Sequence, residues 1–210
     1  ARGTLTRVRP NGRKEVISNI GDGPNGAAIG PDGACYVCNN GGFAWEKDAL
    51  SNRIRPIRQA DNYTTGRIER IDLNTGKVER LYDQCNGIKL NGPNDIVFDR
   101  RGNMWFTDLG KARARDMDRG SVYWARPDGT EIREVIQPIT TPNGIGLSPD
   151  EKTLYVAETE GARLYSFPVS GDGTVEKLPF PQSLNGGTLV TCDGGLRRFD
   201  SLAVEENGNT

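Results

Sequence analysis

Four polar side chains recur at one position of an internal repeat, and their types could support chemistry. Three are asparagines in Pro-Asn-Gly or Pro-Asn-Asp turns, and the fourth is an aspartate. In chain order they are Asn25, Asn94, Asn143 and Asp200. Three carboxamides and one carboxylate offer only oxygen ligands of low total charge, which suits Ca²⁺ with waters, Mg²⁺ or Mn²⁺. Asp200 is the member that can accept a proton.

The repeat consists of a turn, an apolar run, a second turn and a second apolar run. Its copies are GPNGAAIGPDGACYVCNNGG (23–42), GPNDIVFDRRGNMWFTDLG (92–110) and TPNGIGLSPDEKTLYVAETE (141–160), and FDSLAVEENGNT (199–210) begins a fourth. A lone Pro-Asn-Gly is best explained as a turn, because Asn and Gly tolerate left-handed backbone. Recurrence in four copies, the last with Asp200 in place of Asn, favours a converging set. We call these four residues the polar ring.

The elements that would position the polar ring are strands. Gly (27 residues) and Pro (12 residues) are abundant, and no helical apolar stripe of useful length is present. The markers lie 69, 49 and 57 residues apart (94−25, 143−94 and 200−143). Four-stranded antiparallel units at such spacing predict an all-β fold, a β-propeller, without the WD40 or kelch signatures. The expected strand pairs are 4–9 with 14–18, 27–29 with 34–38, 67–73 with 77–81, 96–98 with 104–107, 121–126 with 132–136, and 163–169 with 174–180.

Three connections should form the walls of one mouth of the propeller, because each follows the second strand of an inner hairpin. They span residues 39–65, 108–120 and 158–162. The first has about 25 residues, far more than an ordinary hairpin loop, which marks it as functional or disordered. Asp108 and Glu158 begin the other two and are candidates to bind substrate hydroxyls. The alternative for each is a solvated strand end.

Composition excludes several classes of function. Lys and Arg total 27 against 28 Asp and Glu, so a nucleic acid or an anionic membrane would find no basic surface. No apolar run approaches the roughly 20 residues that span a bilayer. The chain has no histidine, which removes Ser-His-Asp, Cys-His and His-based zinc chemistry.

The four cysteines are interpreted as small buried residues with reduced thiols. They are Cys35, Cys38, Cys85 and Cys192. Cys35 and Cys38 stand three apart in an expected strand, so their side chains point to opposite faces and cannot grip one metal ion. Reduced thiols favour a reducing compartment, and a cytoplasmic location is expected.

The segments GPNDIVFDRRGNMWFTD, TPNGIGLSPDEKTLYVAE and FDSLAVEENGN, in this order, resemble the SMP-30/gluconolactonase/LRE family of six-bladed propellers. The resemblance covers essentially the whole chain. It implies one divalent cation on the propeller axis, for which we expect Ca²⁺, with Zn²⁺, Mg²⁺ and Mn²⁺ as alternatives. Asn143 and Asp200 match the metal-binding Asn and Asp of the family, and Asn94 matches the Asn that binds metal or substrate beside them. Asn25 falls in a more variable blade and is assigned, with Asn94, to substrate binding.

The chain departs from the family pattern at its ends. The remaining metal ligand of the family is a glutamate in a Glu-Gly-Pro motif, and the chain begins after that point. We therefore expect residues 1–210 to be one incomplete propeller domain from a protein of about 300 residues. It would hold the outer half of blade one, blades two to four and the start of blade five.

The resemblance implies a metal-dependent hydrolase of small lactones, such as sugar lactones. The metal would polarise the ester carbonyl, and Asp200 would act as general base or nucleophile. Two alternatives remain open: phosphotriester hydrolysis at the same metal site, and a non-catalytic binding module pinned by the metal. A strictosidine-synthase-like condensing enzyme would need a glutamate that is not found here.

Overall fold

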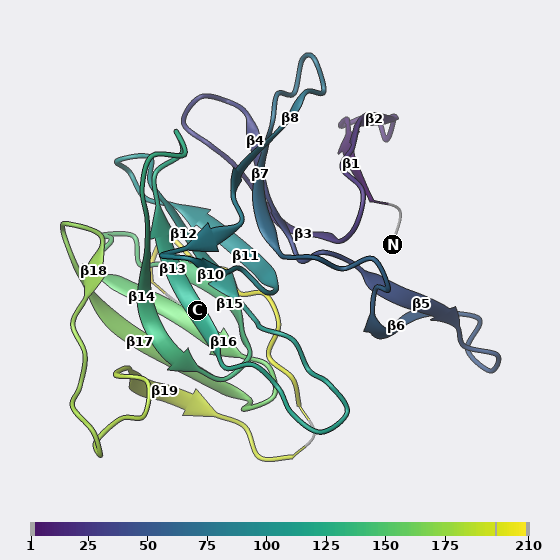
Figure 1. The fold of residues 1–210 in the computed structure, drawn as a ribbon. Helices are drawn as coiled ribbons and strands as arrows, with labels where there is room; N and C mark the ends of the chain where they lie inside the picture. Colours follow the sequence, from purple (N-terminus) through teal and green to yellow (C-terminus); the bar gives the residue numbers. More distant parts are fainter. Residues whose placement is uncertain (1–2, 196, 209–210) are drawn as a thin grey trace.

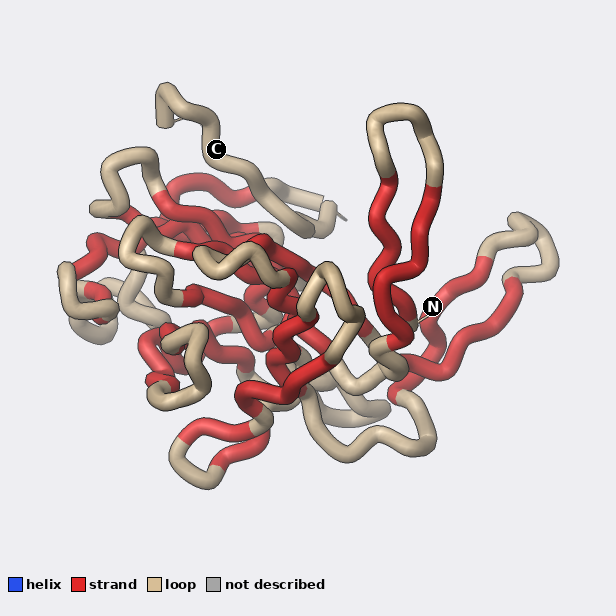
Figure 2. Tube along the Cα trace, turned by 90° about the horizontal axis from the view of Figure 1, so that it is seen from above, coloured by secondary structure: helices blue, strands red, loops and turns tan. Residues whose placement is uncertain are grey.

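The protein is built of β-strands. A computed structural model describes residues 3–195 and 197–208. These residues hold strands and turns but no α-helix (Figure 2), and so no helix among them is suited to crossing a membrane. The strands are β1 (Thr4–Val8), β2 (Lys14–Asn19), β3 (Pro24–Ile29), β4 (Cys35–Asn39), β5 (Phe43–Lys47), β6 (Ile54–Gln59), β7 (Arg67–Ile71), β8 (Val78–Tyr82), β9 (Gln84–Cys85), β10 (Ile88–Lys89), β11 (Pro93–Phe98), β12 (Met104–Asp108), β13 (Gly120–Ala125), β14 (Ile132–Ile139), β15 (Pro142–Leu147), β16 (Thr153–Glu158), β17 (Arg163–Ser170), β18 (Thr174–Val175) and β19 (Thr188–Cys192).

Three antiparallel sheets form the body of the molecule, and we call them blades A, B and C (Figure 1). Blade A has the order β3-β4-β7-β8, and blade B has the order β11-β12-β13-β14. Blade C has the order β15-β16-β17, and β17 pairs with both β18 and β19. The pairs β1–β2, β5–β6 and β9–β10 are separate hairpins. This confirms the predicted all-β class and its four-stranded antiparallel units.

Turn chemistry explains the inner hairpins, as β11–β12 shows. The Asp99 side chain accepts hydrogen bonds from the backbone N–H groups of Arg101 (3.0 Å) and Asn103 (2.8 Å). Gly102 has φ of +83°, a left-handed value that glycine adopts without strain. An Asx turn followed by glycine therefore reverses the chain between two strands of apolar and β-branched residues.

The hydrophobic core lies between the blades. One cluster joins blade A to blade B through residues such as Tyr36 and Phe106, and a second joins blade B to blade C through Trp105 and Phe167. Both faces of blade B are therefore covered, and every residue of β4, β12 and β13 is buried. The predicted split of the cysteine pair is confirmed, because Cys38 joins the first cluster whereas Cys35 faces a third cluster near Ile20.

The structure differs from the sequence-based predictions at one cysteine and in two connections. Cys85 is buried, but Cys192 is exposed, so the prediction of four buried cysteines was wrong for one. The connection 39–65 is not an open loop, because it folds into the β5–β6 hairpin. The predicted strand 174–180 is limited to β18, and β19 takes its place beside β17. Beyond β18 the Leu178 N–H donates to the Gly186 carbonyl at 2.8 Å instead of to β17, so the strand ends early.

The innermost strands lie side by side, with β11 between β3 and β15. Residues 199–204 continue the series beyond β15, because the Gly144 N–H donates to the Asp200 carbonyl at 3.0 Å. Neighbouring inner strands approach each other so closely that glycine is required at two positions. A Cβ on Gly26 would lie 2.4 Å from the Asn94 carbonyl oxygen, and one on Gly144 would lie 2.5 Å from the Asp200 carbonyl oxygen. The markers of the repeat therefore meet at one mouth.

Candidate functional site

The three asparagines of the polar ring stand at the same irregularity in each blade. The cross-strand register shifts between Pro24 and Ala27 in blade A, and between the matching pairs in blades B and C. Each shift is a β-bulge that contains the Asn and the residue after it. A bulge bends its strand and turns a side chain away from the regular alternation. The repeat thus places Asn25, Asn94 and Asn143 equivalently, as the sequence alignment predicted.

Asn143 is buried and only half of its carboxamide is used. Its Nδ2 donates to Thr159 Oγ1 at 2.9 Å, and Thr159 Oγ1 in turn donates to the Phe199 carbonyl at 2.8 Å. The Asn143 Oδ1 atom is shielded from solvent and has no hydrogen-bond partner among the described residues. A buried amide oxygen without a partner costs free energy, which makes this atom a candidate ligand-binding group.

Asp200 is brought next to Asn143 by the segment after blade C. Its backbone carbonyl accepts the Gly144 N–H, and its side chain is exposed. A second carboxylate, Asp95, lies close enough to interact electrostatically with Asp200. Burial raises the pKa of Asp95, and the neighbouring Asp200 charge raises it further. Neither carboxylate has an ion-pair partner among residues 3–195 and 197–208.

Asp95 lies beside the polar ring, and the sequence reasoning gave it no role. It directly follows the marker Asn94, where the other copies have Gly26, Gly144 and Ser201. Its side chain accepts hydrogen bonds from the backbone N–H groups of Ile96 (3.0 Å) and Ile145. The sequence could have pointed to Asp95, because it is the one carboxylate at a repeat position that otherwise carries Gly or Ser.

The other two ring members carry free carboxamides. The Asn25 side chain is exposed and that of Asn94 is half-buried. Neither makes a hydrogen bond to a group in the described part of the chain. Both therefore keep an amide oxygen and an amide N–H₂ for a ligand at the mouth.

A second repeated position, distinct from the polar ring, is occupied by Asn39 in blade A, Asp108 in blade B and Glu158 in blade C. We call it the clamp position. These residues are the cross-strand partners of Pro24, Pro93 and Pro142, respectively. The Asp108 carboxylate is buried and accepts the backbone N–H groups of Asn91 (2.7 Å), Gly92 (2.6 Å) and Gly110 (2.9 Å). Burial raises its pKa, although these three N–H groups act in the opposite direction.

Glu158 is held in a similar way. Its Oε1 atom accepts the Thr140 N–H at 2.8 Å, and its Oε2 atom meets the Arg163 guanidinium at 2.6 Å. Asn39 Oδ1 accepts the N–H groups of Gly23 (3.0 Å) and Gly41 (3.1 Å). The clamp residues are thus bound to backbone at the entry of the inner strands, rather than being solvated strand ends. Their contact with substrate hydroxyls stays a prediction.

The sequence comparison decides the family. The family described as SMP-30/Gluconolactonase/LRE-like region matches residues 1–210. The chain belongs to this family. This confirms the resemblance predicted from the repeated Pro-Asn turns and the closing FDSLAVEENGN segment.

Similar proteins within the family are lactonases by name. The lactonase drp35 of Staphylococcus aureus is 34% identical over 209 residues, covering 99% of this chain and 56% of the relative. The lactonase drp35 of Staphylococcus epidermidis is 29% identical over 210 residues, covering 99% of this chain and 55% of the relative. The gluconolactonase of Zymomonas mobilis is 29% identical over 218 residues, covering 96% and 53%. The chain spans about half the length of these curated relatives.

Solved structures show the fold. A gluconolactonase from Xanthomonas campestris has a TM-score of 0.69 at 24% identity, with 99% of this chain and 61% of that chain covered. An inactive virginiamycin B lyase from Staphylococcus aureus has a TM-score of 0.56 at 18% identity, covering 86% and 50%. The predicted β-propeller architecture is confirmed by this likeness.

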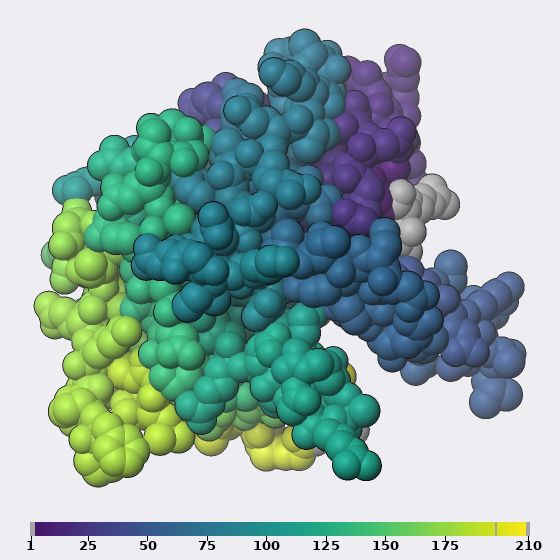
Figure 3. Space-filling view, in the orientation of Figure 1, coloured from purple at the N-terminus to yellow at the C-terminus, as the bar shows by residue number. Residues whose placement is uncertain are grey.

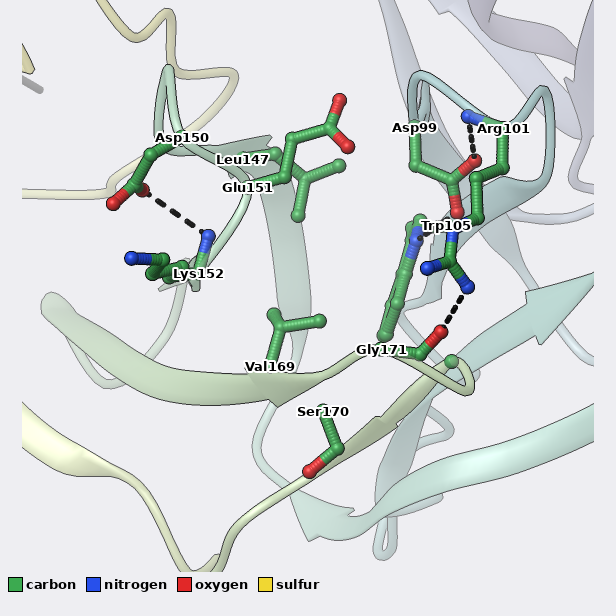
Figure 4. A pocket seen from close by; sticks show the side chains of 11 residues that line it. Asp99, Arg101, Trp105, Leu147, Asp150, Glu151, Lys152, Val169, Ser170 and Gly171 are labelled. Carbon is green, nitrogen blue, oxygen red and sulfur yellow. Dashed lines mark hydrogen bonds between the residues drawn. The ribbon is translucent and has the colours of Figure 1, made fainter.

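A pocket at the other end of the strands is separate from the polar ring. It has a volume of about 270 Å³ and lies between the hairpin turns of blades B and C (Figure 4). Asp99, Arg101 and Glu151 line it together with the edge of Trp105. Arg101 donates to the Gly171 carbonyl across it. None of the four ring residues lines this pocket, which is a crevice between blades.

Proposed function

We propose that this chain belongs to a hydrolase of small lactones, sugar lactones in particular, which works with a divalent cation at the polar ring. Membership of the SMP-30/gluconolactonase/LRE-like family and the lactonase names of its relatives support the reaction class. The observation that carries the site is the buried, unpartnered Oδ1 atom of Asn143 beside Asp200.

The residues present fit a hard divalent cation. Asn143 Oδ1 and the Asp200 carboxylate would be ligands, and Asn94 would complete the set from the adjacent blade. Oxygen ligands from carboxamide and carboxylate groups are those that Ca²⁺ takes in proteins, and Ca²⁺ is the ion we propose. The pair Asp95 and Asp200 adds negative charge that no cationic side chain among the described residues neutralises. Those residues hold no group of three or more His, Cys, Asp and Glu side chains that could bind a metal ion, so the proposed site relies on carboxamide ligands as well.

The chemistry divides between the cation and the chain. A bound divalent cation would supply Lewis-acid polarisation of the ester carbonyl. Asp200 would take a proton from a water molecule, whose oxygen forms the new bond to the carbonyl carbon. The ring C–O bond then breaks, and the same proton passes to the departing alkoxide, leaving a hydroxy acid. Asn25 and Asn94 would orient hydroxyl groups of the substrate through their free carboxamides.

The test uses protein expressed from the complete reading frame and a panel of sugar lactones, with acid release followed by a pH indicator. Chelation should abolish turnover and Ca²⁺ should restore it. Asp200→Asn should lower kcat/KM by about 100-fold or more, the usual contribution of a general base. The matched control is Asp172→Asn, in a hairpin turn at the opposite end of blade C, which should leave turnover unchanged.

Three outcomes would overturn parts of the proposal. Turnover that survives both chelation and Asp200→Asn would remove the cation and the base together. Faster hydrolysis of a fluorophosphonate than of every lactone would reassign the substrate to phosphotriesters. Ca²⁺-dependent thermal stabilisation without any turnover would leave a binding module in place of an enzyme.

A further inference from the structure

Lys111 is a buried cation that joins two blades at the mouth. It lies in the connection between β12 and β13 of blade B, and only 9% of its surface is exposed. Its Nζ atom donates to the Asn40 carbonyl oxygen at 2.6 Å. Asn40 follows β4 of blade A and leads into the β5–β6 hairpin. An ammonium that has given up most of its water needs strong partners, so this contact is a specific one.

Two aromatic rings complete the surroundings of the ammonium. The Lys111 Nζ atom lies 5.1 Å from the ring centroid of Phe43 and 4.8 Å from that of Tyr63. These distances are within the range of cation–π attraction, which strengthens when the cation is desolvated. Phe43 begins β5, and Tyr63 follows β6, so the two aromatic residues stand on either side of the hairpin base.

The charged groups around Lys111 come from its own blade. Asp108 and Asp118 both favour the charged amine through space, and the Asp118 carboxylate also accepts the Lys111 backbone N–H at 3.0 Å. Asp118 is paired with Arg113 at 2.7 Å. On the side of blade A, the Tyr63 hydroxyl donates to the Asn91 carbonyl at 2.8 Å, which fixes its ring beside the ammonium.

The β5–β6 hairpin itself has little support from a core. It forms a sheet of two strands outside the blades, and it projects from the body beside the 109–119 connection (Figure 3). Trp45, Ile54 and Ile57 on it are 41%, 61% and 55% exposed. An isolated hairpin of two strands is marginally stable in water. Its position therefore depends on the contacts at its base, where Lys111 lies.

We propose that Lys111 is a positioning residue, an ammonium latch that holds the β5–β6 hairpin of blade A against the mouth loop of blade B. The hairpin then forms a fixed wall beside Asn25 and Asn94 instead of a mobile flap. The latch is defined by contacts between two blades, so it can be tested without turnover. Only its effect on substrate binding rests on the function proposed above.

Amide hydrogen exchange, read by mass spectrometry, tests the latch directly. Lys111→Met keeps the length and apolar stem but removes the charge and the donor to Asn40. Loss of one charged hydrogen bond and one cation–π site should speed exchange of residues 43–59 by about 10- to 100-fold. Lys111→Arg keeps a cation over the aromatic rings and should restore most of the protection. The control Lys77→Met removes an exposed lysine in the turn between β7 and β8 of blade A and should leave exchange of residues 43–59 unchanged.

Two further readouts separate a latch from general destabilisation. Exchange in β16 and β17 of blade C should stay at the wild-type rate in Lys111→Met. Acrylamide quenching should increase for Trp45, which is 41% exposed, whereas Trp105 and Trp124 are 1% and 4% exposed and should remain protected. Unchanged exchange at residues 43–59 in Lys111→Met, with the fold intact, would overturn the latch.

A partner substitution and a kinetic readout complete the test. Phe43→Leu removes one of the two cation–π contacts and should release the hairpin less than Lys111→Met. The double variant should add little to Lys111→Met alone, because the Phe43 contact is already lost there. If the hairpin is a wall of the lactone site, Lys111→Met should raise KM with kcat nearly unchanged. Faster exchange without a change in KM would keep the latch and reject its role in binding. Loss of all turnover in wild type would reject the proposed function alone.

Discussion

Replacing Asp108 tests whether the clamp position holds the fold or contacts the substrate. Asp108→Ala leaves three buried backbone N–H groups, those of Asn91, Gly92 and Gly110, without an acceptor. Each such group costs roughly 1–3 kcal/mol, so the free energy of unfolding should fall by about 3–9 kcal/mol. That is a large part of the total stability of an ordinary domain.

Asp108→Asn should be much milder, at about 1 kcal/mol. The amide keeps one acceptor oxygen, and it removes a charge whose burial raises the pKa of the carboxyl. Asn39 already holds two N–H groups at the same position of blade A as a neutral carboxamide. Blade A therefore shows that the fold accepts the amide.

Urea unfolding followed by tryptophan fluorescence measures both variants, because Trp105 on the strand of Asp108 pairs with Trp124. With a slope of roughly 2 kcal/mol/M, the midpoint of Asp108→Ala should fall by at least about 1.5 M. The control Asp128→Ala, in an exposed turn of the same blade, should move the midpoint little. An unchanged midpoint in Asp108→Ala, together with a raised KM for lactones, would refute this reasoning and place Asp108 in substrate binding.

Three other predictions use the same structure. Glu158→Gln breaks a buried contact with Arg163 at 2.6 Å and should lower the free energy of unfolding by about 2–3 kcal/mol in urea titrations, with equal stability as the contrary result. Burial lowers the pKa of Lys111 from 10.5 to about 8, so between these values the unfolded chain holds a proton that the folded protein has lost. Stability should therefore rise with pH across that window, and Lys111→Met, measured by thermal melting at several pH values, should remove the rise. Gly144→Ala places a Cβ 2.5 Å from the Asp200 carbonyl oxygen, so calorimetry should show weaker Ca²⁺ binding although every proposed ligand is retained.

Much of the fold could be predicted from turn chemistry. Asp99, Gly102 and their counterparts mark reversals by local hydrogen bonds and backbone preference, which depend on few residues. The outer edge of blade C could not be predicted in this way. Only the two residues of β18 pair with the end of β17, and after a connection the chain returns to pair with β17 again as β19. Packing favours this second pairing, because Gly187, next to β19, lies so close to the Phe167 ring that a Cβ there would be 2.5 Å from it.

The connection 39–65 shows a second limit of sequence reasoning. Its length indicated a functional or disordered segment, but its hairpin is organised by contacts far along the chain. Lys111 reaches Asn40 across 71 positions of sequence, and a lysine in a polar loop normally indicates a solvated surface. Only the three-dimensional structure shows that this amine lies between Phe43 and Tyr63.

Hydrogen bonding separates two repeated positions that look alike in the sequence. Both the polar ring and the clamp position place a polar side chain at a strand end in every blade, so repetition alone assigns both to the site. At the clamp position, Asp108 and Glu158 are saturated by backbone N–H groups or an arginine. At the polar ring, Asn143 keeps a buried oxygen without a partner among the described residues. A buried oxygen without a partner costs free energy that a bound ligand would recover, and this difference supports the proposal that the chemistry belongs to the ring rather than to the clamp position.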